Sequence, residues 1–388
     1  MPTGTPLAAS RSTTERHDMT PSDPGARRAG ADTTLVRHLN RRTVLTTLRS
    51  HPDITLSTLG SLTGLSRATL SAVLEELTER GLLEEHAPAT GGSGRPARRY
   101  AFRATAGYVL GLHFTPNQVR AVVTDLEGQV VARERTEVPP SVPAPERLAR
   151  ARALAETATS QAGPVWSVGV ATTGVVGPEG RVLRSSQIAG WTGLDLVGTV
   201  RGWYGRDAVA GNDGTLAALG EKWQGAARYA DDVALILSGR PSGQGIVLGG
   251  RAHHGRSGAA AELGRLLQDQ TWNAAAVLDE AGRTAQDVFR AASEGEEEAS
   301  RLAAHLAHHT ARAASVLVSV LDPQLVVIAG ELTVGGRPFL EAVRLQLETM
   351  CINVPAVVLS ELGDDAVPLG AARLALDALE EKEYALEG

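Results

Sequence analysis

The chain has a single cysteine, Cys351, among 388 residues. One thiol excludes a disulfide framework within the chain and a zinc site built from several cysteines. Aromatic residues make up only 4% of the composition, whereas 43% of the residues are hydrophobic and 42 are glycine. This composition favours an α/β protein rich in Ala, Val and Leu, with two or three domains. Because no apolar run is long enough to span a membrane and no signal-peptide pattern is present, we expect a cytoplasmic protein.

Net positive charge is concentrated in one region. Residues 35–103 hold 10 arginines and 6 acidic residues, a net charge of +4, although the whole chain carries −6. Attraction to a polyanion would therefore come from this end of the chain.

The preceding residues 1–34 are rich in Pro, Gly, Ser, Thr and Arg without periodicity, and we expect a disordered tail. It would be either a dispensable start or a basic arm.

Residues 35–103 have the pattern of a winged helix-turn-helix. A first helix is expected to end at His51-Pro52-Asp53, because the residue before proline is pushed out of the α region. Thr55 and Ser66 are predicted N-caps of two short helices that are joined by a tight turn at Gly64. The second of these would end at Gly81 and bury a stripe of apolar residues, Leu70, Val73, Leu74 and Leu77.

In a helix-turn-helix, the second helix enters the major groove with its N-terminal residues nearest the bases. The predicted DNA contacts there are Ser66, Arg67, Ala68, Thr69 and Ser71. Leu82–Glu85 and Arg99–Phe102 are predicted to pair as the hairpin of a wing, whose arginines would reach phosphates or the minor groove: Arg95, Arg98 and Arg99. The alternative interpretation is a structural helical hairpin with a solvated basic loop.

From Tyr108 onward, predicted strands alternate with Ala-rich helices, which favours α/β layers. The predicted strands are 108–114, 119–125, 130–132, 166–171, 207–210, 233–238, 245–248 and 325–329. The predicted helices are 146–161, 214–223, 298–321, 336–350 and 368–381.

Over about residues 40–380 the chain resembles the ROK family of repressors and sugar kinases. The matching segments are Leu110-Gly-Leu112, Gly169-Val-Ala-Thr-Thr-Gly174, Ala189-Gly-Trp191, Gly211-Asn-Asp-Gly214, Gly258-Ala-Ala-Ala-Glu-Leu-Gly264, Val327-Ile-Ala-Gly330 and Leu369-Gly-Ala-Ala372. The resemblance implies an actin-like ATPase (ribonuclease H-like) α/β fold with two lobes around a cleft. The expected organisation is a tail (1–34), a winged helix-turn-helix (35–103) and a two-lobed sensor and dimerisation domain (104–388).

The resemblance also implies a sugar site at Asn212-Asp213. In the family this Asp is the catalytic base that deprotonates a sugar hydroxyl, and a carboxylate beside a carboxamide suits adjacent hydroxyls. Alone, Asn-Asp before a helix is more often an N-cap or turn. Glu262 falls on a family position that touches sugar, and the other candidate ligand residues are Gln187, Gly190, Trp191 and Arg265. Trp191 would either stack on a sugar or be a buried tryptophan of the cleft. Arg265 replaces a sugar-contacting His, so it favours a phosphorylated or acidic sugar, or it pairs with Glu262 or is exposed on the surface.

Three departures from the family pattern predict that phosphoryl transfer is lost. His113-Phe-Thr-Pro-Asn117 stands where the kinases have an Asp and a Gly-Gly-Thr turn, and His is a poor Mg²⁺ organiser. Gly239-Arg-Pro-Ser-Gly243 replaces the phosphate loop, and its Pro removes an N–H donor. Arg265, without nearby cysteines, replaces the start of the family's zinc cluster. We therefore expect no cofactor: neither zinc nor ATP with Mg²⁺.

The sequence thus predicts a DNA-binding transcriptional regulator, a repressor of carbohydrate genes, rather than an enzyme. Its expected partners are double-stranded operator DNA, a sugar or sugar-phosphate effector, and further copies in a homodimer or homotetramer, with no membrane partner. The alternatives are a sugar kinase with an appended DNA-binding domain and a regulator with a vestigial, empty cleft. His305, His308 and His309 are expected on a solvated helix face rather than in a metal site.

Overall fold

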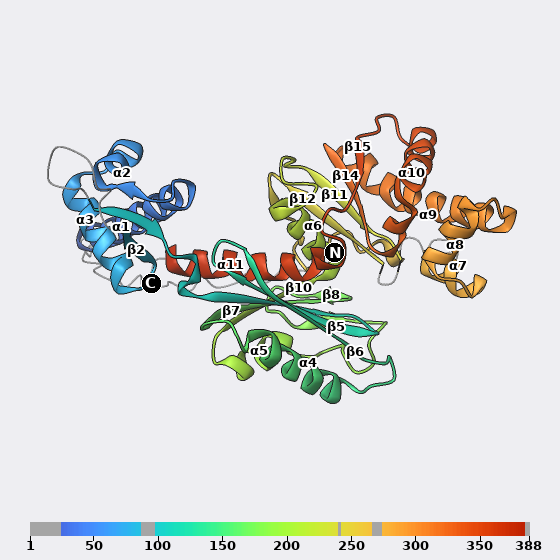
Figure 1. Cartoon of the computed structure of the whole chain (residues 1–388), viewed down its shortest axis with the longest axis horizontal. Helices are drawn as coiled ribbons and strands as arrows, with labels where there is room; N and C mark the ends of the chain where they lie inside the picture. Colours follow the sequence, from blue (N-terminus) through green and yellow to red (C-terminus); the bar gives the residue numbers. More distant parts are fainter. Residues whose placement is uncertain (1–24, 87–97, 240–241, 266–273, 385–388) are drawn as a thin grey trace, which may run out of the picture.

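The structure, a computed structural model, describes residues 25–86, 98–239, 242–265 and 274–384 (Figure 1). It has a small N-terminal domain and two α/β lobes. The N-terminal domain consists of α1 (Gly25–Ser50), β1 (Ile54–Thr55), α2 (Leu56–Thr63), α3 (Arg67–Glu79), β2 (Leu83–His86) and β3 (Arg99–Phe102). Its strands form a sheet of order β1-β3-β2 beside the three helices. This is the winged helix-turn-helix that the sequence predicted.

The first helix begins earlier than expected. We predicted disorder for residues 1–34, but α1 already includes residues 25–34. Proline is absent from residues 25–51, and the Ala and Arg residues in this segment favour a helix, so the helix can extend back to Pro24. Residues 1–24 lie outside the described part of the chain.

The first lobe is a five-stranded sheet of order β10-β7-β4-β5-β6. Its elements are η1 (Ala104–Ala106), β4 (Tyr108–Phe114), β5 (Gln118–Asp125), β6 (Val130–Glu137), α4 (Ala144–Thr159), β7 (Val165–Thr172), β8 (Val175–Val176), β9 (Val182–Arg184), α5 (Leu196–Tyr204) and β10 (Asp207–Asn212). Leu110, Leu112 and Phe114 alternate along β4 and are buried in a core with residues of α4 and α5. Those helices therefore cover one face of the sheet.

The second lobe is a sheet of order β13-β12-β11-β14-β15. Its elements are α6 (Asp213–Gln224), β11 (Val233–Leu237), β12 (Gly243–Leu248), β13 (Arg251–Ala252), η2 (Leu263–Arg265), α7 (Ala274–Ala281), α8 (Ala285–Ser293), α9 (Glu297–Leu321), β14 (Leu325–Ala329), η4 (Glu331–Gly335), α10 (Gly336–Met350), β15 (Ala356–Leu359), η5 (Gly363–Asp365) and α11 (Ala366–Tyr384). Helices α9 and α10 cover its outer face in one core. Its other face packs on α6 and the start of α11.

Helices α6 and α11 therefore lie between the two sheets, and glycines bring their backbones together. A Cβ added to Gly370 of α11 would lie 1.7 Å from the Leu216 carbonyl oxygen of α6. A Cβ on Gly169 of β7 would lie 1.8 Å from the Ala371 carbonyl oxygen. Because only glycine leaves room for such contacts, these positions fix how closely the lobes approach α11.

Helix α11 also reaches the N-terminal domain (Figure 1). Arg49 Nη1 of α1 lies 2.5 Å from Glu380 Oε1, and the Arg49 guanidinium stacks 4.7 Å from the Phe102 ring centroid. Leu376 shares one buried cluster with apolar residues of α1, α2 and α3. One continuous helix thus contacts both lobes and the winged domain.

The predicted strands and helices from Tyr108 onward are all present, with ends shifted by a few residues. The elements that the sequence did not reveal are short, among them β8, β9, α5 and β15. Within the described residues, no helix combines the length and apolar character needed to cross a membrane.

Candidate functional site

The two helices of the helix-turn-helix begin as predicted. The Thr58 amide donates to Thr55 Oγ1 at 3.2 Å, and the Thr69 amide donates to Ser66 Oγ at 3.2 Å. Gly64 between the helices has φ +69°, and Gly81 after α3 has φ +71°. Both are left-handed conformations that favour glycine, so the predicted turn and the predicted end of α3 are confirmed.

The first turn of α3 is open to solvent. Ser66, Arg67, Ala68 and Ser71 are exposed, and Thr69 is half-buried. The opposite side of α3 buries its four predicted apolar residues. Glu76 forms an ion pair with the buried Arg41 of α1, which holds α3 against α1. The exposed turn is therefore presented on a rigid support, as groove reading requires.

The wing is anchored at its base by a charged contact. Arg99 of β3 donates from Nε to Asp53 Oδ2 at 2.8 Å and from Nη2 to the Asp53 carbonyl oxygen at 2.5 Å. Asp53 has φ +66°, a strained value for a non-glycine residue. Hydrogen bonds that the ring of the neighbouring His86 donates to the carboxylates of Asp53 and Glu84 raise the pKa of His86. Arg99 therefore holds the wing to the loop before α2.

Of the other two predicted wing arginines, Arg98 is within the described residues and Arg95 is not. Arg98 is 72% exposed and lies 3.3 Å from Glu85, a surface pair that competes little with a phosphate. Arg95 lies outside the described residues. Arg98 is thus the described wing arginine whose guanidinium faces solvent.

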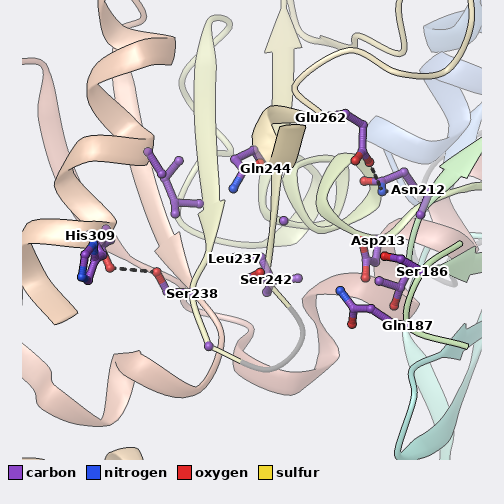
Figure 2. Close-up of a pocket in the computed structure, with 18 residues that line it drawn as sticks. Ser186, Gln187, Asn212, Asp213, Leu237, Ser238, Ser242, Gln244, Glu262 and His309 are labelled. Carbon is purple, nitrogen blue, oxygen red and sulfur yellow. Dashed lines mark hydrogen bonds between the residues drawn. The ribbon is translucent and has the colours of Figure 1, made fainter. Parts of the chain in front are cut away.

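Between the lobes lies a cavity of about 280 Å³ (Figure 2). Both lobes and α6 contribute to its walls. The lining residues with polar or ionisable side chains are Thr173, Ser186, Gln187, Asn212, Asp213, Ser238, Ser242, Gln244, Glu262, His309 and Thr310. The cavity brings together the predicted ligand residues Gln187, Asn212, Asp213 and Glu262.

Asp213, the first residue of α6, is 1% exposed. Its Oδ1 accepts a hydrogen bond from the Gly214 amide at 2.9 Å. Its Oδ2 makes no hydrogen bond of normal geometry among the described residues, although the Thr173 hydroxyl is near enough to influence the carboxyl group. Burial raises the pKa of Asp213 to about 7, and the nearby charge of Glu262 adds to this, while Thr173 and the Gly214 amide act in the opposite direction. Asp213 thus offers an unpartnered carboxyl oxygen at the wall of the cleft.

Asn212 has a positioning role. Its Oδ1 caps α6 by accepting from the Thr215 amide at 3.1 Å. Its Nδ2 donates to Glu262 Oε1 and to the Gly174 carbonyl oxygen, both at 3.0 Å. Burial raises the pKa of Glu262, although Arg184 opposes this shift. Since both amide protons are used within the protein, Asn212 orients Glu262 rather than donating to a ligand.

Three predicted ligand residues are not shown at the cavity wall. Trp191 is fully buried, donates from Nε1 to Thr172 Oγ1 at 2.8 Å and packs 5.2 Å from the Phe114 ring centroid. The prediction that it touches a ligand is wrong, because its ring completes the core of the first lobe. Gly190 is exposed in a turn with φ +70° and does not line the cavity. Arg265 ends η2, and its side chain lies outside the description.

The far wall contains residues that sequence reasoning missed. His309 was expected on a solvated face, but it is 9% exposed and lines the cavity together with Ser238 and Thr310. The buried residues Leu306, His309, Thr310 and Ala313 of α9 follow helical spacing. That periodicity was the available signal for an inward-facing histidine.

The end of β4 carries a buried imidazole. His113 is 4% exposed, and neither of its ring nitrogens has a hydrogen-bond partner among the described residues. Burial, assisted by Arg120, lowers the pKa of His113 to about 3, so the ring is neutral at physiological pH. Within the described residues, no three His, Cys, Asp or Glu side chains form a group that could hold a metal ion.

This combination defines a class: a winged helix-turn-helix attached to a two-lobed fold of the sugar-kinase type. The ROK family model matches residues 109–275 and 265–378, and the MarR family model matches residues 39–92. The chain is similar to the DNA-binding transcriptional dual regulator NagC of Escherichia coli (strain K12), with 23% identity over 92% of this chain and 97% of that protein.

Solved structures show the same fold. A ROK family transcriptional regulator described as a homolog of the E. coli MLC protein has a TM-score of 0.74 at 20% identity, covering 90% of this chain and 99% of that one. A ROK family glucokinase from Streptomyces griseus, in complex with glucose and AMPPNP, has a TM-score of 0.63 at 25% identity, covering 70% and 100%. The chain belongs to the ROK family and is built as a DNA-binding transcriptional regulator of that family.

Proposed function

We propose that this protein represses carbohydrate genes by binding operator DNA, and that a neutral sugar in the cleft changes that binding. The observation that carries the effector proposal is the buried Asp213, whose Oδ2 is unpartnered beside a Glu262 carboxylate oriented by Asn212. Carboxylates accept hydrogen bonds from hydroxyl groups, which every neutral sugar supplies. The glucokinase relative was solved with glucose, which agrees with this choice of ligand.

The charge of the cleft favours a neutral sugar over a sugar phosphate. Asp213 and Glu262 both line the cavity, and the described lining residues include neither Lys nor Arg. A phosphate group placed here would face two carboxylates and, among the described lining residues, no cation, which is unfavourable in a partly desolvated site.

We also propose that the protein is not a kinase and holds no zinc. Phosphoryl transfer needs a metal and donors that cradle the phosphates. The end of β4 instead presents the buried, neutral His113, a poor metal organiser. The chain has one cysteine, Cys351, so it lacks the several thiolates of the family's zinc cluster, and no group of three His, Cys, Asp or Glu side chains among the described residues could hold a metal ion. The replaced phosphate loop, Gly239–Gly243, lies partly outside the described residues.

The fold offers a physical connection between the two sites. Asp213 is the first residue of α6, and α6 packs on α11 at Gly370. Helix α11 in turn contacts α1 through the ion pair between Glu380 and Arg49. A ligand that favours one arrangement of the lobes would shift α11 and hence the winged domain. Since one helix-turn-helix reads a half-site, we propose a homodimer on a palindromic operator.

We expect Arg67→Ala to weaken binding to a duplex selected from a random-sequence pool. The loss should be about 1–3 kcal/mol if Arg67 contacts a base, or the salt slope should fall by about 1 if it contacts a phosphate. Fluorescence anisotropy over a salt series measures both quantities. Arg150→Ala is the matched control, because Arg150 is exposed on α4 and pairs there with Glu146. Unchanged affinity and slope in Arg67→Ala would refute this DNA-reading face.

We expect at least one neutral sugar to lower the affinity for this duplex by about fivefold or more, the range of ordinary allosteric coupling. The same protein, incubated with that sugar, ATP and Mg²⁺, should form no sugar phosphate above background. A coupled assay for ADP release measures the second result. Steady turnover would support the sugar-kinase alternative, and no response to any sugar would support the vestigial cleft.

A further inference from the structure

The cleft has two chemically different ends (Figure 2). Gln187, Asp213 and Glu262 lie toward one end, which includes both carboxylates. Ser238 and His309 lie at the other end, where the described lining residues bear hydroxyl and imidazole groups and no carboxylate or cation. Ser242 and Gln244 lie between the two ends. A ligand confined to the carboxylate end would leave the second end unfilled.

The hydroxyl groups of Ser238 and Thr310 determine which hydrogen bonds the second end offers to a ligand. The Thr310 hydroxyl donates to the Leu306 carbonyl oxygen at 2.9 Å, which uses its single proton. The Ser238 hydroxyl, 3.0 Å from Thr310 Oγ1, must then be the donor in that pair. The lone pairs of Ser238 Oγ therefore remain available to accept a hydrogen bond from a ligand.

His309 adds a buried polar group without a protein partner. Its ring is 9% exposed, lines the cavity, and has no partner for Nδ1 among the described residues. Burial, together with His308, His305 and Arg312, lowers the pKa of His309 to about 4, so the ring is neutral. A neutral imidazole has one donor and one acceptor nitrogen, which matches a hydroxyl group. Buried polar groups without partners are rare and call for an explanation, such as a ligand.

We propose that the Ser238–His309 end is a second sugar subsite, so that the effector is a neutral disaccharide or longer saccharide. This inference rests on the proposed sugar-binding function of the Asp213 end. A phosphate-bearing ligand such as a nucleotide would find no cation among the described lining residues.

The test is calorimetric titration of the full chain with glucose, xylose, N-acetylglucosamine and their β-1,4-linked disaccharides, and with glucose 6-phosphate and ATP. We expect one disaccharide to bind at least about tenfold more tightly than its monosaccharide. His309→Ala and Ser238→Ala should each remove most of that advantage and leave monosaccharide affinity within about twofold. Arg301→Ala is the control, because Arg301 is exposed on the same helix and pairs there with Glu297.

The possible results separate this inference from the proposed function. If monosaccharides bind and release DNA but no disaccharide binds more tightly, the second subsite is refuted and the proposed function stands. Tighter binding of ATP or glucose 6-phosphate, or an undiminished disaccharide advantage in folded His309→Ala and Ser238→Ala, also overturns it. If no sugar of any length binds, the proposed function itself fails. Thermal melts of each variant establish that it is folded.

Discussion

Asp213→Asn should raise the melting temperature of the ligand-free protein at pH 7.5 and weaken sugar binding by about tenfold or more. Asp213 is buried, and burial raises its pKa to about 7, so at pH 7.5 the ligand-free protein holds a largely ionised carboxylate in a site that disfavours the charge. Asparagine keeps the Oδ1 acceptor for the Gly214 amide and removes that charge. The expected gain is about 1–3 kcal/mol, or about 3 °C or more.

The difference in stability between Asp213→Asn and the wild type depends on pH. The unfolded chain releases the Asp213 proton near pH 3.8, whereas the folded protein retains it up to about pH 7. Between these values the native state binds more protons than the unfolded state, so the contribution of Asp213 to stability falls as pH rises. Above about pH 7 that contribution is constant. Asp213→Asn should remove this slope, so the variant's advantage grows from pH 4 to pH 7 and then levels off.

Thermal denaturation from pH 4 to pH 8.5 measures the stability effect, and calorimetry measures the loss of sugar affinity. Glu134→Gln is the matched control, because Glu134 is an exposed carboxylate on β6. The interpretation fails if Asp213→Asn lowers the melting temperature at every pH and leaves sugar affinity unchanged. A site of this kind exchanges stability for binding, because the group that recognises hydroxyls is costly when none is present.

Gly370→Ala should destabilise the protein by about 3 kcal/mol or more, or prevent soluble expression. Its Cβ would lie 1.7 Å from the Leu216 carbonyl oxygen, and a backbone atom in the packed centre of the protein does not move aside easily. The substitution would therefore push α11 away from α6. In any folded fraction, the effect of sugar on DNA affinity should be reduced, since both helices join the cleft to the winged domain.

Gly202→Ala provides the control for Gly370→Ala. Gly202 lies in α5 with no other heavy atom within 4 Å of an added Cβ, so alanine there should stabilise by about 0.5–1 kcal/mol. Soluble yield and the midpoint of guanidinium chloride unfolding report on both variants. A Gly370→Ala midpoint equal to that of the wild type would show that α6 and α11 are not locked together as described.

Local patterns in the sequence were sufficient for much of the fold. Thr55, Gly64, Ser66 and Gly81 define the helix-turn-helix because capping hydrogen bonds and left-handed turns depend on single residues and their nearest neighbours. The strands at 108–114 and 325–329 were predicted with their observed ends, since buried strands give continuous apolar runs. Short elements such as β15 and the pair β8 and β9 give too few residues for a periodic signal.

The site was only partly predictable. Asn212, Asp213 and Glu262 were recognised from a family pattern, and the structure joins them through the contact between Asn212 and Glu262. Trp191 was assigned wrongly because an aromatic residue in a sugar-loop motif gives the same sequence pattern whether its ring faces the cleft or the core. His309 was missed because the cleft face of α9 exists only once β11 is placed beside it.

The sequence by itself determined that this chain reads DNA through a winged helix-turn-helix and carries a two-lobed sugar-kinase-type domain. Caps, turns and apolar periodicity reveal these features because they depend on residues that are close together in the chain. Tertiary structure decided which groups face the cleft, which arginine anchors the wing, and that α11 joins both lobes to the winged domain. Those features depend on contacts between residues far apart in the chain, such as Arg49 with Glu380 and Asp53 with Arg99. Burial and pKa follow from such contacts, so they appear only when the chain has folded.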